Sequence, residues 1–425
     1  MSDNVSMGRG RARFLGLPAA AVCLAALAAS GCTCVGGGDG VDLESISIGG
    51  YYRAEIIGEG GDAVPFFIHL PEDESAGAHV RNGRDEIEAD HTWDGADVRV
   101  EFPIYRTVIE ATAREDDALV GSFRSESPAF DSGELEFRAE PAAAPKPAAR
   151  FRAGDDPDTS AQMPEHWRLT FDDMGDGALA LTLEGDGGAE GTLHLENGNA
   201  IYLAGDAGDD RLRLSAFDGS SPYLLEAELS GDRLEGRWIA GPGLEWREPL
   251  TGAAEPDYEV AVNVNVAFAG SDYRPPVPEL RQPPYRGSPT ILALTGSWSP
   301  ASMRIVPFLG ELREEHAGDE LQILALNYEL TDDEDYNDEA VAAIVSRFDV
   351  DWEMIPIDGG PEDYATIMPA GFEQTDVQSF PVLAFIDRDG FVAAVRAGFP
   401  PEASGDPYAA TVAEYRELAA DLAAE

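Results

Sequence analysis

The sequence predicts a multidomain protein in which two antiparallel β-rich modules, barrel-like or sandwich-like, precede an α/β domain. Residues 51–137 alternate between apolar and polar side chains, so that Val98, Val100 and Phe102 share one face of a strand. A second segment repeats features of the first at a constant offset. Beyond residue 289 the pattern changes to continuous apolar runs separated by amphipathic stretches, which is typical of parallel strands joined by helices.

The first module has turn signals at short spacing and lacks the 3.6-residue periodicity of helices. The turn pairs are Gly60-Gly61, Asn82-Gly83, Asp94-Gly95 and Asp116-Asp117. Strands separated by such turns pair with their neighbours along the chain. The pattern therefore predicts an antiparallel meander that closes into a small barrel or sandwich.

A second copy of this module follows at an offset of 115 residues. Asn82-Gly83 matches Asn197-Gly198, Phe102 matches Phe217, and Leu119–Phe123 matches Leu234–Trp238. One offset shared by three separate features predicts an internal repeat. The Ala/Pro-rich run between the copies predicts a linker.

The N-terminus carries the features of an export signal. Three arginines within the first 13 residues precede an Ala-rich apolar stretch of about 17 residues, which is short for a membrane-spanning helix. The stretch ends in Ala29-Ser30-Gly31-Cys32, which resembles a bacterial lipobox. That resemblance implies that Cys32 is lipidated. Because Thr33 is not an aspartate, it also implies an anchor in the outer membrane, facing the periplasm.

The segments expected from these patterns cover the whole chain. They are a signal peptide over 1–31, a lipidated tether over 32–45, the first β-rich module over 46–139, the Ala/Pro linker over 140–150, the second β-rich module over 151–270, a Pro-rich linker over 271–289 and the α/β domain over 290–425. Six prolines fall within 274–289, so we expect that segment to be stiff, extended and solvated.

Composition argues against several classes of function. The 425 residues include 80 acidic and 29 basic side chains, a net charge of -51, and the acidic residues are spread along the chain. No nucleic-acid partner is expected, because phosphate binding needs clustered Lys and Arg. The cysteines are Cys23, Cys32 and Cys34, so no residue after Cys34 can form a disulfide or act as a cysteine nucleophile.

No metal site and no cofactor are expected. The six histidines lack the close spacing that zinc ligands show. Residues 172–177 resemble a calcium loop only faintly, because Met174 and Leu183 stand where ligands would be needed. We interpret that segment as a turn.

The C-terminal region predicts alternating strands and helices. The expected order is a strand over 290–295, an amphipathic helix ending at Gly318, a strand over 321–328, a helix at about 337–348, a strand pair over 382–387 and 391–399, and a helix at about 408–424.

Two motifs about 80 residues apart carry a resemblance to a known family. The first contains Gly287, Pro289, Trp298, Pro300 and Pro307, and the second contains Pro381 followed by an Asp-x-x-Gly turn. Both are similar to the TlpA and redoxin (alkyl hydroperoxide reductase/thiol-specific antioxidant) family of thioredoxin-fold proteins. The resemblance covers roughly residues 275–425 and implies a thioredoxin-like domain in which Pro381 is the cis-proline.

Ser299 and Ser302 stand where this family has its two redox cysteines. In the family, the first cysteine lies at a helix N-terminus, where the helix dipole lowers the pKa of its thiol. A serine hydroxyl does not ionise at neutral pH and cannot form a disulfide. We therefore expect no redox catalysis, and we expect Ser299 to act as a helix N-cap. His316 lies about four turns further along the helix, too far away to serve Ser299 as a base.

The resemblance also implies a peptide-binding groove beside the cis-proline. Its expected residues are Trp298, Ser299, Pro300, Ser302, Phe380 and Pro381. The sequence thus predicts a redox-inactive lipoprotein that binds protein or peptide clients in the periplasm. Two alternatives stay open. One is thiol-disulfide oxidoreductase or antioxidant redoxin activity, as in the family. The other is binding of an envelope component by the β-modules, with the thioredoxin-like domain as scaffold.

Overall fold

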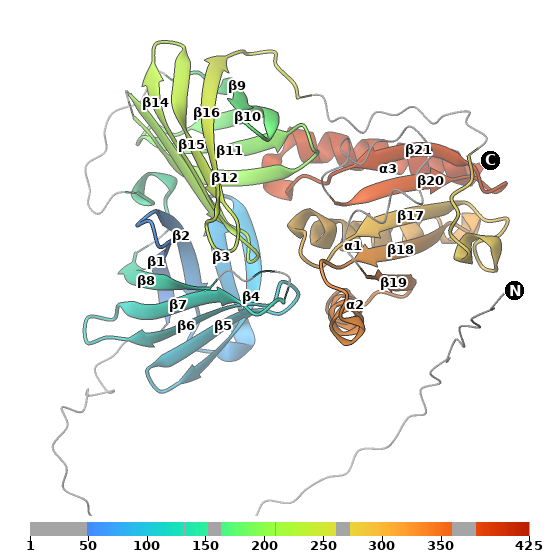
Figure 1. The fold of residues 1–425 in the computed structure, drawn as a ribbon, viewed down its shortest axis with the longest axis horizontal. Helices are drawn as coiled ribbons and strands as arrows, with labels where there is room; N and C mark the ends of the chain where they lie inside the picture. Colours follow the sequence, from blue (N-terminus) through green and yellow to red (C-terminus); the bar gives the residue numbers. More distant parts are fainter. Residues whose placement is uncertain are drawn as a thin grey trace, which may run out of the picture. The chain divides into compact units, whose positions relative to one another are not determined.

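The computed structural model describes residues 49–128, 130, 133–143, 145–151, 163–208, 210–260, 273–358 and 380–424. The expected signal peptide, the tether, Cys32 and Cys34 lie outside these residues. No helix in the described part of the chain is long and apolar enough to cross a membrane. Figure 1 labels the elements in chain order, from β1 to α3.

The first β-rich module is a closed, eight-stranded antiparallel barrel. Its strands are β1 (Gly50–Ile57), β2 (Ala63–Leu70), β3 (Ala78–Asn82), β4 (Asp85–Asp94), β5 (Asp97–Phe102), β6 (Thr107–Ala113), β7 (Leu119–Ser125) and β8 (Glu134–Ala142). The barrel closes because β1 pairs with β2 on one side and with β8 on the other. Closure leaves no free sheet edge.

The second module is also a closed, eight-stranded antiparallel barrel. Its strands are β9 (His166–Phe171), β10 (Gly175–Leu183), β11 (Gly188–Leu195), β12 (Ala200–Ala207), β13 (Arg211–Phe217), β14 (Pro222–Ser230), β15 (Arg233–Ala240) and β16 (Trp246–Ala254). Here β9 closes the barrel by pairing with both β10 and β16. Of the two predicted architectures, barrel and sandwich, the structure shows the barrel in both modules.

The predicted repeat is confirmed strand by strand. Each strand of the second barrel overlaps the position 115 residues after its counterpart, from β1 and β9 to β8 and β16. Gly121 in β7 and Gly236 in β15 are equivalent, and both lie directly against the backbone of the preceding strand. A Cβ atom would collide there with the carbonyl oxygen of Glu110 or Glu226, which explains why both copies have glycine.

The described residues of the expected Ala/Pro linker belong to regular structure and to the contact between the barrels. Residues 140–142 complete β8, and Pro147–Ala149 form a 3₁₀ turn. Arg150 is fully buried. Its guanidinium donates to the backbone oxygen of Arg81 in the first barrel, at 2.5 Å, and to that of Ser215 in the second, at 2.8 Å. One buried side chain therefore joins the two barrels.

The C-terminal region is a five-stranded mixed sheet with helices. Its elements are β17 (Thr290–Thr295), α1 (Pro300–Glu315), β18 (Gln322–Tyr328), α2 (Glu334–Phe348), β19 (Glu353–Ile357), β20 (Val382–Ile386), β21 (Val392–Ala397) and α3 (Asp406–Ala424). The strand order is β19-β18-β17-β20-β21. The pairs of β18 with β17 and β19 are parallel, whereas β20 is antiparallel to both β17 and β21. This is the arrangement expected of a thioredoxin-like domain.

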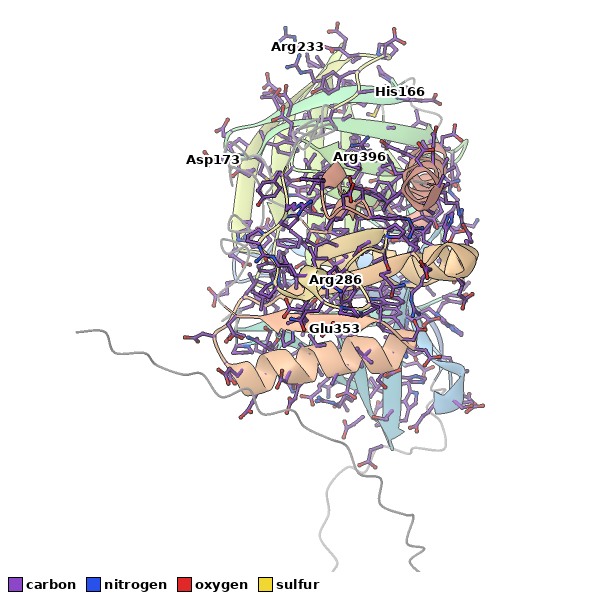
Figure 2. The ribbon with its side chains drawn as sticks, turned by 90° about the vertical axis from the view of Figure 1, so that its right-hand side faces the viewer. His166, Asp173, Arg233, Arg286, Glu353 and Arg396 are labelled. Carbon is purple, nitrogen blue, oxygen red and sulfur yellow. The ribbon has the colours of Figure 1, made fainter. Side chains whose placement is uncertain are left out.

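Two details differ from the prediction. A short edge strand, β19, which contains Pro356, was not expected from the sequence pattern. Figure 2 labels Glu353 on β19 and Arg396 on β21, which are the two edge strands of the sheet. The described part of the Pro-rich segment is not solvated throughout. Val277 and Tyr285 are buried in the hydrophobic cluster of this sheet, because apolar side chains alternate with the prolines.

Candidate functional site

The sequence around the N-terminus of α1 folds so that Ser299 caps the helix, as predicted. Its backbone is extended, with φ -101° and ψ 111°, and Pro300 follows in the first helical turn. The Ser299 Oγ accepts a hydrogen bond from the backbone N–H of Ser302 at 3.3 Å. The same hydroxyl donates to the carbonyl oxygen of Phe380 at 2.9 Å. The Ser299 hydroxyl therefore acts as both hydrogen-bond donor and hydrogen-bond acceptor within the domain.

Ser302 is fully buried one turn into the helix. Its Oγ accepts a hydrogen bond from the backbone N–H of Gly296 at 3.3 Å. This contact fixes the loop between β17 and α1. The hydroxyls of Ser299 and Ser302 therefore both stabilise the loop between β17 and α1.

A buried carboxylate supports the same loop. Glu329, directly after β18, accepts hydrogen bonds from the Ser297 hydroxyl at 2.7 Å and from the Ser297 backbone N–H at 3.2 Å. The side-chain amide of Asn327 donates to the same carboxylate at 2.5 Å. Burial raises the pKa of Glu329, and these three hydrogen bonds partly oppose that shift. Sequence reasoning missed Glu329, although an acid next to a continuous apolar strand is the pattern that could have indicated it.

The expected peptide-binding residues meet at one place, and most of them are covered. The Phe380–Pro381 peptide bond is cis. Ser299, Ser302, Phe380 and Pro381 are buried, whereas Trp298 and Pro300 are partly exposed. The Trp298 indole N–H donates to the Tyr328 carbonyl at 2.9 Å, and its ring meets that of Phe380 edge to face. Four of the six expected side chains are therefore covered by other parts of the protein.

Loops of the second barrel cover this region. The Ser220 hydroxyl lies 3.5 Å from the carbonyl oxygen of Trp298. The guanidinium of Arg304, on α1, reaches the carbonyl oxygen of Ala200 at 3.4 Å. Gly398, after β21, lies so close to the Gly198 backbone that a Cβ atom would collide with it. These contacts place loops of the second barrel against Trp298, Arg304 and Gly398, beside the expected peptide-binding residues.

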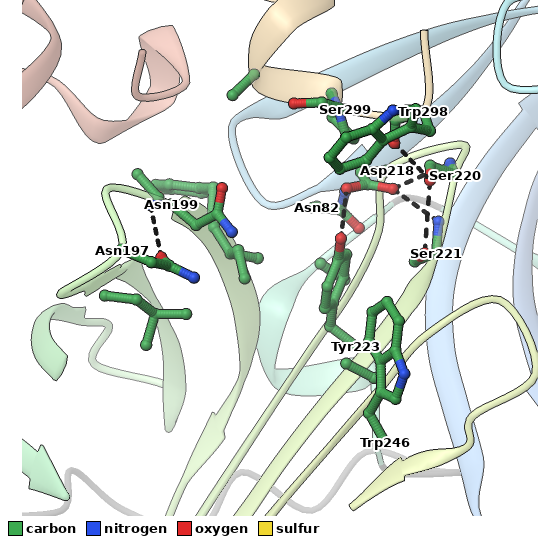
Figure 3. A pocket seen from close by; sticks show the side chains of 18 of the residues that line it. Asn82, Asn197, Asn199, Asp218, Ser220, Ser221, Tyr223, Trp246, Trp298 and Ser299 are labelled. Carbon is green, nitrogen blue, oxygen red and sulfur yellow. Dashed lines mark hydrogen bonds between the residues drawn. The ribbon is translucent and has the colours of Figure 1, made fainter. Parts of the chain in front are cut away.

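A cavity of about 300 Å³ remains beside Trp298. This volume lies at the lower end of the range for ligand pockets. Trp298, Ser299, Pro300, Ala301 and Arg304 contribute from the thioredoxin-like domain. The second barrel supplies most of the remaining lining, and the first barrel adds Asn82, Asp85 and Phe130. Figure 3 shows Trp298 and Ser299 above Asp218 and Tyr223, with Asn197 and Asn199 across the cavity.

Asp218 organises one wall of this cavity. Its carboxylate accepts from the backbone N–H groups of Ser220 and Ser221, at 3.0 and 2.9 Å, and from the Tyr223 hydroxyl at 2.9 Å. Figure 3 shows these contacts as dashed lines. Burial raises the pKa of Asp218 despite the three donors. The carboxylate thereby fixes the β13–β14 turn.

A second acid, Asp85, has a different environment. Burial raises the pKa of Asp85 to about 6; Arg304 opposes this shift, and Asp218 adds to it. Among the residues that the structure describes, its carboxylate has no hydrogen-bond donor. The Nε of Arg304 is likewise buried without an acceptor in the described part of the chain. Perturbed, unsatisfied charged groups at a cavity are typical of functional sites.

Aromatic side chains continue the wall that contains Asp218. The rings of Tyr223 and Trp238 stack with centroids 5.7 Å apart. Trp246, at the start of β16, is 52% exposed, and it is the only large apolar side chain in the described residues with so much surface in solvent. Sequence reasoning assigned no barrel residue to a site. The only signal available was the clustering of tryptophans in this half of the repeat.

Comparisons with known proteins extend only to the fold. No protein-family model and no curated protein sequence matches the chain. Among solved structures, the chain is similar to a secreted thiol-disulfide isomerase from Corynebacterium glutamicum, at 18% identity over 33% of this chain and 74% of that one, with a TM-score of 0.25. It is also similar to a secreted Mycobacterium tuberculosis disulfide oxidoreductase homologous to E. coli DsbE, at 16% identity over 32% of this chain and 84% of that one, with a TM-score of 0.23.

A third similar structure is StoA from Bacillus subtilis, at 15% identity over 32% of this chain and 84% of that one, with a TM-score of 0.23. Each of the three likenesses covers about a third of this chain. The description of the C-terminal region as thioredoxin-like rests on its own strand order and strand directions.

Proposed function

We propose that this chain is a redox-inactive, thioredoxin-fold binding protein of the cell envelope. The observation that carries the proposal is the use of Ser299 and Ser302. Both hydroxyls are buried and engaged in hydrogen bonds that hold the β17–α1 loop. Ser299 and Ser302, which take the place of the reactive cysteines, therefore stabilise a loop next to a cavity.

Disulfide exchange needs a thiolate nucleophile and a second thiol that resolves the mixed disulfide. No cysteine follows Cys34 in the sequence. The dipole of α1 stabilises negative charge at its N-terminus, but a serine hydroxyl stays protonated at neutral pH. Folding cannot supply the missing chemistry, so the oxidoreductase alternative has no reacting atom in this domain.

Binding is the function that remains, and we place it in the cavity rather than along the covered Pro381 edge. Trp298, Ser299 and Pro300 belong to both the expected groove and the cavity lining. Because the second barrel supplies most of that lining, the proposal combines client binding with the idea that the β-modules bind a ligand. The thioredoxin-like domain then forms one wall.

The envelope location is part of the proposal. It is supported by the lipobox-like residues that end at Cys32 and by the Ala-rich apolar stretch before them. Replacing Cys32→Ser should abolish lipidation and release the chain from the membrane fraction. Mass spectrometry of the mature N-terminus is the measurement. An unmodified Cys32 in the wild-type protein would contradict an outer-membrane lipid anchor.

The experiment that tests redox inactivity is insulin reduction by dithiothreitol, with the full chain added. We expect no rate above the background with dithiothreitol alone. The Cys34→Ser variant is the matched control, because any thiol-dependent activity of the wild type would have to use the N-terminal cysteines. Turnover by the wild type that disappears in Cys34→Ser would overturn the proposal.

A further inference from the structure

The cavity beside Trp298 combines an exposed aromatic surface with polar groups that lack partners. Trp246 presents its ring at 52% exposure, and Tyr223 and Trp238, stacked on each other, also line the cavity. Among the described residues, neither the Asp85 carboxylate nor the Asn199 side-chain amide is hydrogen-bonded. Both residues are half-buried, and the neighbouring Arg304 Nε is buried without an acceptor in the described part of the chain. A buried polar group without a partner destabilises the folded protein, so a ligand that supplies the missing bond would be favoured there.

The charges in the cavity compensate one another. Arg304 interacts electrostatically with both Asp85 and Asp218, and it lowers the pKa of each carboxyl. The two acids and the guanidinium thus form one group rather than separate anionic and cationic poles. A zwitterion or a strongly charged ligand needs such separated poles, whereas a neutral ligand does not.

The polar lining offers both kinds of hydrogen-bonding group. Asp85 only accepts when ionised, Arg304 only donates, and Asn199 does both. A hydroxyl group, which is both donor and acceptor, can satisfy any of them. A ring that carries several hydroxyls around its edge and C–H groups on its face can also lie against the negatively polarised face of an indole.

We propose that this cavity binds a neutral, polyhydroxylated ring ligand of the saccharide class, with Trp246 as its stacking surface and Asp85, Asn199 and Arg304 as its hydrogen-bonding partners. The inference rests on the proposed binding function and names its ligand class. The volume of about 300 Å³ suits a ligand of one or two small rings. Asp218 keeps the wall in place through its bonds to the β13–β14 turn.

Isothermal titration calorimetry of the full chain tests the proposal. The probes are maltose, cellobiose and N,N′-diacetylchitobiose, with the zwitterionic dipeptides Ala-Ala and Gly-Leu as the competing class. Two variants, Trp246→Ala and Asp85→Ala, remove the stacking surface and the unpaired acceptor. Trp93→Ala and Asp94→Ala are matched controls in the first barrel, because neither residue lines the cavity.

We expect saturable binding of at least one disaccharide and none of the dipeptides. Trp246→Ala should weaken that binding about tenfold or more, which corresponds to about 1.4 kcal/mol. Asp85→Ala should weaken it several-fold, and the controls should leave it unchanged. Trp246 is exposed, so its replacement should leave the fold intact, and thermal unfolding verifies this.

Two results would overturn the inference. Dipeptide binding without disaccharide binding would refute the ligand class and leave the binding function standing. Binding that survives Trp246→Ala, or no saturable binding of any probe, would refute the cavity as the saccharide site. Neither result bears on redox inactivity, which the insulin assay measures independently.

Discussion

The two barrels share one repeat but differ at the end where β5 and β13 stop. Phe123 in the first barrel and Trp238 in the second occupy equivalent positions, 115 residues apart. The Phe123 ring packs against Phe217, which the second barrel inserts into the hydrophobic core of the first. Trp238 instead stacks on Tyr223 and lines the cavity. The end of the first barrel is filled by a residue of its partner, whereas the equivalent end of the second barrel lines a cavity.

The asparagines of the shared Asn-Gly turn show the same divergence. Asn82 donates to the carbonyl oxygen of Phe217 at 2.9 Å and accepts from its N–H at 3.1 Å, so it holds the inserted residue from both sides. Asn197 accepts from the backbone N–H of Asn199 at 3.0 Å, a contact within its own turn. The difference teaches that two similar barrels can use the same turn differently: in the first it holds a residue of the second barrel, and in the second it lies beside the cavity.

Removing the inserted ring should have the largest effect on stability. Phe217 is fully buried, with ring centroids 5.0, 5.2 and 5.3 Å from those of Phe66, Phe102 and Phe123. Phe217→Ala should lower the free energy of unfolding by about 3–5 kcal/mol, because it leaves a cavity among these rings. Urea denaturation measures the change.

The control for Phe217→Ala is Trp246→Ala, which replaces an exposed ring and should change the free energy of unfolding by about 0.5 kcal/mol or less. Similar effects of the two substitutions would show that Phe217 is not the residue that seals the first barrel.

Replacing the two equivalent asparagines should have smaller effects on stability, but it compares the two barrels at the same position. Asn82→Ala leaves both backbone groups of Phe217 buried without a partner and should cost about 2–3 kcal/mol of unfolding free energy. Asn197→Ala removes a turn contact on the cavity side and should cost about 1 kcal/mol or less. Chemical denaturation of both variants under the same conditions measures the difference. Equal losses of unfolding free energy would mean that the two asparagines stabilise the protein equally, which would contradict the proposed difference.

The smallest expected effect is a pH dependence that arises from Asp85. Its carboxyl has a folded-state pKa of about 6 against 3.8 when unperturbed, so the folded state binds the proton more tightly. Stability from this group is present at low pH and is lost as the pH rises through about 6. Asp85→Asn should therefore be more stable than the wild type at pH 7.5, by about 1–2 kcal/mol.

That advantage should disappear as the pH falls towards 4, where the wild-type carboxyl is protonated. Arg304, Asp218 and Glu86 are the charged groups that act on Asp85, and they are the same in both proteins. Urea unfolding at pH 7.5 and pH 4.5 measures the difference. An advantage that is independent of pH would show that Asp85 titrates normally.

Periodicity predicted the strands and helices well where the local sequence is sufficient to determine the secondary structure. The run Thr290–Thr295 forms a strand with the predicted bounds, and the constant offset located both barrels. The prediction failed where distant contacts decide. Pro356 argued against a strand at 353–357, because proline is excluded from central strands. It is tolerated here because β19 lies at the edge of the sheet. Val277 is buried by a sheet that the local pattern does not reveal.

The site divides in the same way. The capping role of Ser299 follows from its place before a helix that starts with proline, so the sequence was sufficient to predict it. The cavity could not be predicted, because Asp85, Asp218 and Trp246 come from different strands and turns. Arg150 looked like part of a linker and proved to be buried between the barrels. No short-range pattern reports such an insertion.

The central claim is that the end of the second barrel at Trp238 lines a cavity that small molecules can reach, whereas the equivalent end of the first barrel is filled by Phe217. The most direct test places one cysteine at each equivalent position, Phe123→Cys and Trp238→Cys, in a chain with Cys23, Cys32 and Cys34 replaced by serine. The rate of reaction with methyl methanethiosulfonate is then measured under native conditions. We predict that Trp238→Cys reacts at least about tenfold faster than Phe123→Cys, which must wait for local opening. Equal rates, or faster reaction at position 123, would contradict the account.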